Sequence, residues 1–189
     1  MRCSLFRVAG VLGLSLLSAG SAMAQQKPAA PPAPAAGAQP SQPGATTATY
    51  QDWVLRCVTQ EGGGQGGGRV CEIAQNLQMQ GQGTVASIAV GRADPKGPVS
   101  LVIQLPPGVW LPAGVKVQVD DKAKPIQLEF KKCLQSCFAE ATLDAAALQQ
   151  LRAASEPGNF TFENGARRTL TLPISFKGFG AALDASLKS

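Results

Sequence analysis

The sequence predicts an all-β protein, built as a β-sandwich with one short helix and preceded by a disordered N-terminal tether. About eight or nine short segments are rich in apolar and β-branched residues, and turn residues separate them at a spacing typical of sandwiches. The chain has 189 residues. The folded part, roughly 135 residues, is long enough to bury about two thirds of its unfolded surface. No internal repeat is present, and the length leaves no room for a second domain.

The first segment, Met1–Ala24, has the three parts of a secretory signal peptide. A short basic start is followed by the apolar run Val8–Ala19 and then by Ala22-Met-Ala24. The apolar run is shorter than the roughly 20 residues that a membrane-spanning helix needs. We therefore expect cleavage between Ala24 and Gln25 and an exported mature chain without a membrane span. Its expected location is the periplasm, with outer-membrane association or secretion as the alternatives.

The next segment, Gln25–Ala48, is almost entirely Ala, Pro, Gln, Gly, Ser and Thr, and it contains no large apolar side chain. Such a segment cannot bury enough surface to offset the entropy that it would lose on ordering. We therefore expect a disordered tether over Gln25–Ala48 and a single folded domain over Thr49–Ser189.

Strands are predicted where apolar or β-branched residues form short runs between turn residues. The Gly-rich run Gly62–Gly68 indicates a hairpin tip, and Gln75–Gly83 indicates a loop or a frayed strand end. Asn164-Gly165 has the signature of a tight two-residue hairpin turn. Apart from the central hairpin, the predicted strands are Tyr50–Val58, Arg69–Ile73, Thr84–Arg92, Val99–Leu105, Val115–Val119, Asn159–Glu163 and Ala166–Leu172, with a continuation to Phe176.

The central hairpin is predicted over Ile126–Leu143. Apolar and polar residues alternate from Ile126 to Lys131, the pattern of a half-buried strand, and Phe138–Leu143 can return beside it. Between these strands, Cys133 and Cys137 flank a three-residue loop, a common length for an antiparallel connection. Residues that face each other across such a pair have Cβ atoms close enough for a disulfide after slight tightening. The sequence thus predicts a hairpin closed by a disulfide.

One helix is predicted after this hairpin. Asp144 is a suitable N-cap, and Ala145–Ala154 are mostly strong helix formers. Leu143 and Leu148 have the spacing of a hydrophobic staple, which fixes the entry of the chain into a helix. At the C-terminus, Ala181–Leu187 is expected to form a short amphipathic tail.

Cleavage at Ala24 would remove Cys3 and leave Cys57, Cys71, Cys133 and Cys137. An even number of cysteines in an exported chain indicates disulfides, although four cysteines allow three pairings. A zinc site is the competing interpretation, but it would normally have two close cysteine pairs. We expect local pairing of Cys57 with Cys71 and of Cys133 with Cys137, because each pair lies on consecutive strand-like segments.

The residue types argue against catalysis. The sequence contains no histidine, which removes Ser-His and Cys-His nucleophilic mechanisms and the commonest metal ligand. Asp120 and Asp121 are candidate acid–base groups, but two lysines lie beside them in a predicted turn, so a solvated loop is the favoured interpretation. A redox role for Cys133 and Cys137 is disfavoured, because catalytic dithiols usually have Cys-x-x-Cys at a helix N-terminus. We expect no enzymatic activity, no cofactor and no metal.

The charge distribution argues against a nucleic-acid partner. Without the signal peptide, 15 basic and 12 acidic residues remain, a net charge of +3, and aromatic residues are few. Arg167 and Arg168, together with Lys131 and Lys132, have two interpretations: a basic patch for an acidic partner, or a charged sheet face that discourages edge-to-edge pairing. The second is favoured.

Several short motifs occur in a specific order along the chain. They are Asp52-Trp53 before Cys57, Cys71-Glu-Ile73, Leu105-Pro-Pro-Gly-Val109, Leu111-Pro-Ala-Gly-Val115, Phe130 with Cys133-x-x-x-Cys137-Phe-Ala, and Leu172-Pro-Ile-Ser-Phe-Lys-Gly-Phe179. Over about Tyr50–Leu187 this order resembles the invasion-associated locus B family of alphaproteobacterial envelope proteins. No single motif is specific, but their combination is, and a Pro-rich tether is also common in that family.

The resemblance implies an immunoglobulin-like β-sandwich in the periplasm or at the outer membrane. In some intracellular pathogens the family is associated with entry into host cells, and it offers no catalytic residue to transfer. We therefore expect an exported, non-enzymatic binding or interaction module with an unidentified envelope or host protein as its partner. The alternatives are a periplasmic housekeeping protein for envelope assembly or stress tolerance, and a hydrolase with an unrecognised carboxylate pair.

Overall fold

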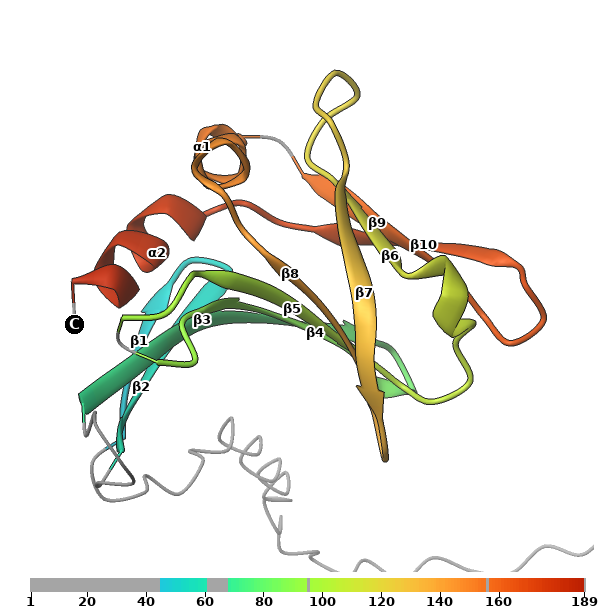
Figure 1. Cartoon of the computed structure of the whole chain (residues 1–189), viewed down its shortest axis with the longest axis horizontal. Coiled ribbons are helices and arrows are strands. Elements are labelled where there is room, and N and C mark those ends of the chain that lie inside the picture. The colour runs from blue at the N-terminus through green and yellow to red at the C-terminus, as the bar shows by residue number, and fades with distance from the viewer. Residues whose placement is uncertain (1–44, 61–67, 95, 156, 189) are drawn as a thin grey trace, which may run out of the picture. The chain divides into compact units, whose positions relative to one another are not determined.

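The computed structural model describes residues 45–60, 68–94, 96–155 and 157–188 (Figure 1). The expected signal peptide with its cleavage site Ala24–Gln25, nearly all of the tether, and most of the glycine-rich hairpin tip lie outside these residues. The described elements are β1 Thr46–Tyr50, β2 Trp53–Gln60, β3 Gly68–Met79, β4 Gly83–Gly91, β5 Ser100–Leu105, the 3-10 helix η1 Leu111–Ala113, β6 Val115–Gln118, β7 Ile126–Cys133, β8 Cys137–Thr142, α1 Ala145–Ala153, β9 Gly158–Glu163, β10 Thr169–Ile174 and α2 Phe179–Leu187.

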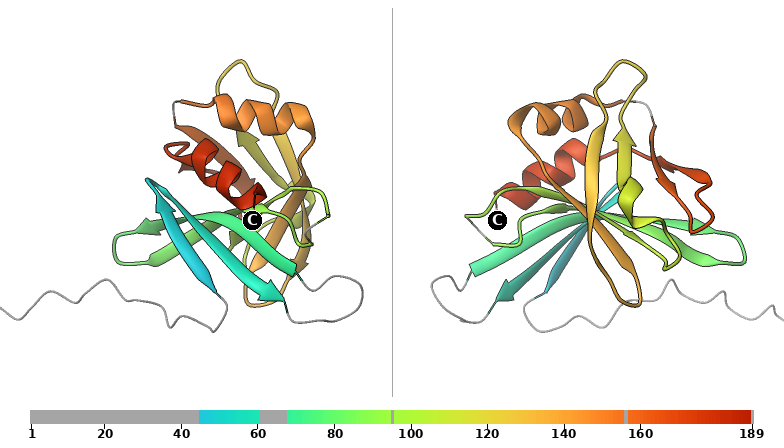
Figure 2. Two further views of the ribbon diagram at one scale, coloured as in Figure 1. Left: turned by 90° about the vertical axis from the view of Figure 1, so that its left-hand side faces the viewer. Right: turned by 45° about the vertical axis from the view of Figure 1, so that its right-hand side comes forward.

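The ten strands of the described residues belong to one antiparallel sheet, in the order β1-β2-β3-β4-β5-β8-β7-β6-β9-β10. Strand β7 joins its two parts: Ile126–Leu128 pairs with β6, whereas Glu129–Cys133 pairs with β8. In Figures 1 and 2, β1–β5 form one arm of a bent sheet and β6, β9 and β10 form the other. The predicted β-rich fold is confirmed. The expected immunoglobulin-like sandwich has two separate sheets, whereas the strands here are joined by hydrogen bonds into one sheet.

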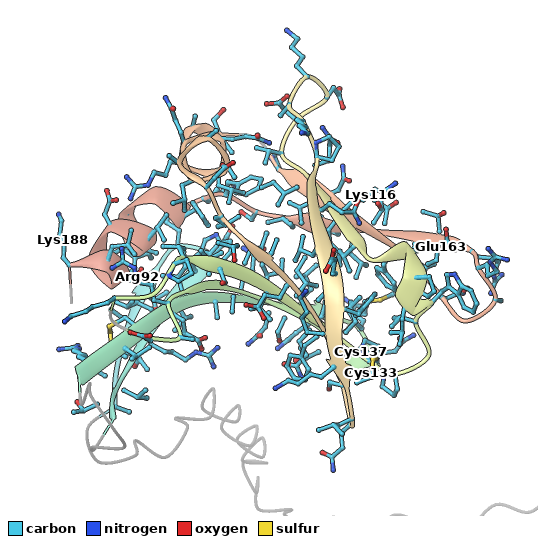
Figure 3. All side chains as sticks on the ribbon, viewed as in Figure 1. Arg92, Lys116, Cys133, Cys137, Glu163 and Lys188 are labelled. Carbon is cyan, nitrogen blue, oxygen red and sulfur yellow. A yellow bond between two sulfur atoms is a disulfide. The ribbon has the colours of Figure 1, made fainter. Side chains whose placement is uncertain are left out.

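Buried and half-exposed residues alternate along the strands that form the core. On β4, Ala86, Ile88 and Val90 are buried and the residues between them are half-exposed; β5 repeats the pattern from Leu101 to Leu105. Side chains from both arms of the sheet fill the space between them (Figure 3). The largest fully buried side chains are Trp53, Phe160, Phe179, Ile73, Ile88, Leu101, Ile103, Leu105, Leu128, Ile174, Leu183 and Val90.

Helix α1 begins where the sequence predicted. The Asp144 side chain accepts a hydrogen bond from the backbone N–H of Ala147 at 2.7 Å, which satisfies one of the unpaired donors at a helix start. The prediction of a single helix is wrong, because α2 forms over Phe179–Leu187. Its buried residues include Phe179, Ala182 and Leu183, so packing on the sheet stabilises a segment whose sequence alone indicated only an amphipathic tail.

The entry into α2 is fixed by a buried glutamine on β3. Gln75 is 8% exposed, and its Oε1 accepts a hydrogen bond from the backbone N–H of Ser175 at 3.0 Å. Its Nε2 donates to the carbonyl oxygens of Ser175 at 3.1 Å and Asp52 at 3.3 Å. The Trp53 indole N–H also donates to the Ser175 carbonyl, at 2.8 Å. A side-chain amide thus joins the C-terminal segment to β2 and β3.

Aromatic packing continues from this junction into α2. The rings of Trp53 and Phe179 meet edge to face, with centroids 5.0 Å apart, and Phe176 meets Phe179 in the same manner at 6.0 Å. Gly178 precedes the helix with a φ of 82°, and a Cβ at this position would collide with the carbonyl oxygen of Tyr50. Glycine is therefore required here both by backbone conformation and by close packing.

Two segments of polar composition extend strands β1 and β3. Thr46–Ala48, assigned to the tether, belong to β1, and Thr46 lies opposite Cys57 on β2, so the predicted end of the tether at Ala48 is wrong. For Gln75–Gly83, the strand-end alternative is the one that agrees with the structure, because β3 continues to Met79. Threonine favours strands, and hydrogen bonds to β2 and β4 satisfy the backbone of these segments.

The tight turn predicted at Asn164-Gly165 is replaced by a longer loop. Asn164 Oδ1 accepts hydrogen bonds from the backbone N–H groups of Ala166 and Arg168, both at 3.0 Å. Arg167, with a φ of 59°, takes the left-handed conformation instead of Gly165. The asparagine side chain therefore organises five residues, Asn164–Arg168, between β9 and β10, which is an Asx-type turn rather than a two-residue one.

Replacement of Gln75 by alanine is expected to lower the free energy of unfolding by about 2–4 kcal/mol. The variant loses three hydrogen bonds and leaves the part-buried backbone N–H of Ser175 without this acceptor. Urea unfolding of the variant and the wild type measures this difference. Gln78→Ala, on an exposed position of the same strand, is the matched control and should change stability by less than about 0.5 kcal/mol. Equal stability of the two variants would contradict this assignment.

Candidate functional site

Two disulfides are present in the described residues, with the pairing expected from the sequence. Cys57 faces Cys71 across β2 and β3, and Cys133 faces Cys137 across β7 and β8. The Cα atoms are 4.0 Å apart in each pair. Because each sulfur is bonded to its partner, the alternative of a Cys₄ zinc site is wrong. Both bridges join neighbouring strands, and neither lies at a helix N-terminus.

The second bridge closes a loop that presents an exposed leucine. Leu134 is 82% exposed, and its backbone N–H donates to the carbonyl of Ser136 at 3.0 Å. At the base of the loop, the ammonium of Lys132 lies 4.8 Å from the centroid of the Phe138 ring. The disulfide and these contacts restrict the loop, so the leucine is held in solvent at the end of the hairpin. This surface is hereafter the hairpin tip, Cys133–Cys137.

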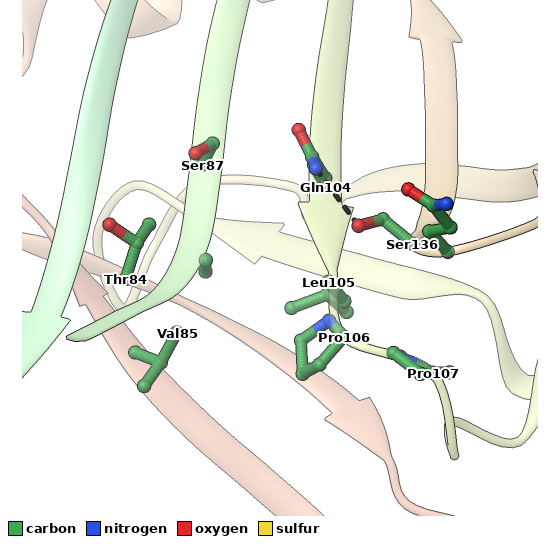
Figure 4. Close-up of a pocket in the computed structure, with 10 residues that line it drawn as sticks. Thr84, Val85, Ser87, Gln104, Leu105, Pro106, Pro107 and Ser136 are labelled. Carbon is green, nitrogen blue, oxygen red and sulfur yellow. Dashed lines mark hydrogen bonds between the residues drawn. The ribbon is translucent and has the colours of Figure 1, made fainter. Parts of the chain in front are cut away.

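A shallow depression adjoins the hairpin tip (Figure 4). Its volume is about 140 Å³, below the roughly 300–1,000 Å³ of small-molecule sites but enough to receive one side chain. Gln104 Nε2 donates to Ser136 Oγ at 3.0 Å across its wall. None of the lining residues is ionisable; they are Thr84, Val85, Ala86, Ser87, Gln104, Leu105, Pro106, Pro107, Gln135 and Ser136. The depression can therefore offer hydrogen bonds and apolar contacts, but no acid–base group.

Strand pairing creates a carboxylate pair that the sequence analysis missed. Glu129 on β7 lies opposite Glu140 on β8, and Lys131 Nζ is 2.8 Å from Glu129 Oε2. The hydrogen bond and charge of Lys131 lower the pKa of Glu129, and Glu129 in turn raises the pKa of Lys131, with a smaller contribution from Glu140. The bulge between Phe130 and Lys132 sets this register, and no sequence pattern indicates the bulge.

The predicted carboxylate pair Asp120-Asp121 lies in an exposed turn, as expected. Asp120 Oδ1 accepts hydrogen bonds from the backbone N–H groups of Lys122 at 2.7 Å and Ala123 at 2.8 Å. Gln118 Nε2 closes the same turn through the carbonyl of Ala123 at 2.6 Å. The Asp120 carboxylate thus organises the connection between β6 and β7.

Three of the four basic residues singled out from the sequence make separate side-chain contacts, and the fourth, Arg168, is exposed. Lys131 pairs with Glu129 and Lys132 lies over Phe138, both within the β7–β8 hairpin. Arg167 instead lies over the ring of Trp110, with 5.0 Å between the guanidinium carbon and the ring centroid. No local sequence pattern indicates the aromatic partner of this arginine, because 57 residues separate the two.

In the residues that the structure describes, no helix is long and apolar enough to cross a membrane.

The family model for invasion associated locus B (IalB) protein matches residues 53–187. The chain belongs to the invasion-associated locus B family. The match begins at the first residue of β2 and ends at the last residue of α2, so both disulfides and the Gln75 junction lie inside the family region.

Two similar proteins come from Brucella abortus. The invasion protein B homologues of two strains, 2308 and biovar 1 strain 9-941, are each 32% identical over 137 residues, covering 72% of this chain and 76% of theirs. The crystal structure of invasion associated protein B from Bartonella henselae superposes with a TM-score of 0.63 at 23% identity, covering 76% of this chain and 95% of that one. This structural likeness shows that the two share a fold.

Removal of each disulfide is expected to destabilise the domain by a different amount. The bridge Cys57–Cys71 spans a sequence separation of 14 and Cys133–Cys137 spans 4. Loop-closure entropy therefore predicts losses of about 3 and about 2 kcal/mol for the two double-alanine variants. Urea unfolding of the variants under identical buffer conditions measures both losses. A larger loss of unfolding free energy on removal of Cys133–Cys137 than on removal of Cys57–Cys71 would contradict this order.

Proposed function

We propose that this family member is an exported, non-enzymatic envelope protein that binds a protein partner through its hairpin tip. The observation that carries the proposal is Leu134, which is 82% exposed at the end of a disulfide-closed loop. An exposed apolar side chain on a restrained loop loses little conformational entropy when a partner pocket takes it up. The neighbouring depression would accept a side chain of the partner in return.

Export is supported by the two disulfides, because such bonds persist in oxidising compartments such as the bacterial periplasm. The predicted signal peptide Met1–Ala24 points the same way. Absence of catalysis is supported by the use of Asp120 as a turn-forming acceptor and by the lack of ionisable groups in the depression. The relatives are named for invasion, and a partner on a host cell is therefore one of the two sources to be tested.

Replacement of Leu134 by serine is expected to weaken partner binding at least tenfold. Full burial of a leucine side chain contributes about 1.5–3 kcal/mol, and each 1.4 kcal/mol or so corresponds to a factor of ten in Kd. The mature protein would be used as bait in separate captures from native envelope extract and from host-cell membrane extract. Affinity for the recovered partner would then be measured for each variant.

The matched control is Val58→Ser, because Val58 is also an exposed apolar residue but lies on β2, away from the hairpin tip. It should bind as the wild type does. Both variants should keep the wild-type circular dichroism spectrum, since neither side chain is buried. Recovery of the same partner with unchanged affinity by Leu134→Ser would refute the role of the hairpin tip, as would recovery of abundant non-specific proteins alone.

A further inference from the structure

A second exposed surface lies where two loops are joined, at a site that the proposed function does not use. The loop 106–114 connects β5 to β6, and the loop 164–168 connects β9 to β10. Gly165 N–H donates to the Gly108 carbonyl at 2.6 Å, and Trp110 N–H donates to the Glu163 carbonyl at 2.8 Å. A bridge between Val109 and Asn164 completes the contact. Figures 1 and 2 show η1 beside the β9–β10 connection.

The joined loops turn their large apolar side chains outward. Val109 packs against the core, whereas Trp110 is 37% exposed and Leu111 is 46% exposed. Positive φ angles at Gly108 and Gly114, 96° and 63°, turn the chain on either side. A Cβ on Gly114 would collide with the Leu128 carbonyl oxygen, so glycine is required at this close approach. The hydrogen bonds to Gly165 and Glu163 hold the loop in the conformation that leaves Trp110 partly exposed.

Basic side chains complete the surface. Arg167 lies over the Trp110 ring at 5.0 Å, Arg168 is exposed beside it, and Leu170 is an exposed apolar residue at the start of β10. Neither loop contains an acidic residue; the first acidic neighbour in the chain is Glu163. We call this surface the Trp110 cap: Trp110, Leu111, Arg167, Arg168 and Leu170.

The residues of the Trp110 cap line neither of the two depressions described for this domain. The nearest depression, of about 80 Å³, is lined by residues of β6, β9 and β10 together with Ala113 and Gly114, and it includes neither Trp110 nor Leu111. Apolar side chains at a protruding loop, with arginines around them and no carboxylate in the loops, match the chemistry of a bilayer interface. Tryptophan favours the headgroup level, leucine the acyl boundary, and arginine the lipid phosphate.

We propose that the Trp110 cap docks the domain on the surface of a bilayer that contains anionic phospholipids. Trp110 and Leu111 enter the interface, and Arg167 and Arg168 contact the phosphates. The contact is peripheral and reversible, because only a few apolar side chains enter the bilayer. It is independent of the hairpin tip, since the two surfaces share no residue, and it leaves Leu134 free for a protein partner.

Flotation of the mature protein with unilamellar vesicles tests the proposal. We expect binding to phosphatidylcholine vesicles that contain phosphatidylglycerol and little binding to phosphatidylcholine alone, with a steep decrease as salt is raised. The double variant Arg167→Gln/Arg168→Gln should bind roughly thirtyfold more weakly, because each cation near an anionic surface contributes a factor of about five. Trp110→Ser/Leu111→Ser should bind at least tenfold more weakly.

Tryptophan fluorescence provides a second measurement on the same samples. Trp53 is 1% exposed and cannot respond to lipid, so a blue shift on vesicle binding reports Trp110. Leu134→Ser is the matched control, because it removes an exposed leucine outside the Trp110 cap, and it should bind vesicles as the wild type does. All the substituted side chains are exposed, and circular dichroism would verify folding.

Three outcomes would overturn the proposal. One is the absence of binding to anionic vesicles by the wild type. Another is vesicle binding that is the same for the wild type and for Trp110→Ser/Leu111→Ser, with no blue shift of Trp110 in the wild type. The last is loss of a protein partner, rather than of vesicle binding, when the Trp110 cap is substituted. Loss of the protein partner by Leu134→Ser alone would leave vesicle binding intact, so failure of this proposal is distinguishable from failure of the hairpin-tip proposal.

Discussion

The bonding of the Gln75 amide to the backbone of Ser175 is the constraint on which the rest of this structure depends. Helix α2 has no strong helix signal of its own, and it forms because Phe179 packs edge to face on Trp53 at the end of a segment that the amide holds in place. An amide offers both a donor and an acceptor, so it fixes the direction of the Ser175 peptide as well as its position. A buried apolar residue at Gln75 would fill the space without specifying that direction.

Strand β7 has the corresponding role for the sheet. Its first half pairs with β6 and its second half with β8, so one strand carries the sheet from one arm to the other. The hairpin tip at its end and the Trp110 cap beyond β6 are therefore presented by a single hydrogen-bonded framework. One surface is restrained by a covalent bridge, and the other by backbone hydrogen bonds between two loops. Rigid display of apolar side chains is what both surfaces share.

Membership of the invasion-associated locus B family accounts for the fold on which these surfaces lie. The family region begins at Trp53, which contributes to the Gln75 junction. The Bartonella henselae structure retains the fold at 23% identity, a level at which surface chemistry is free to differ. The shared fold accounts for the framework, and the exposed Leu134 and Trp110 are the positions at which the function of this member is proposed to reside.

The sequence by itself determined the local features of this protein. Alternation from Ile126 to Lys131 indicated the half-buried strand β7, Asp144 indicated the start of α1, and the spacing of Cys133 and Cys137 indicated a disulfide-closed hairpin. Each of these depends on residues within a few positions of one another, where the backbone period and side-chain reach leave one arrangement. The family resemblance, carried by ordered motifs, was likewise readable and is confirmed.

Only the tertiary structure decided the features that join distant segments. Gln75 lies in a polar stretch predicted as a loop, and its partner Ser175 is 100 residues away. Arg167 and its aromatic partner Trp110 are 57 residues apart, so no local pattern connects them either. A continuous sheet replaced the expected sandwich because β7 divides its hydrogen bonds between two neighbours, a choice that alternation along one strand does not encode. Long-range pairing is set by the total packing of the core, which no window of the sequence contains.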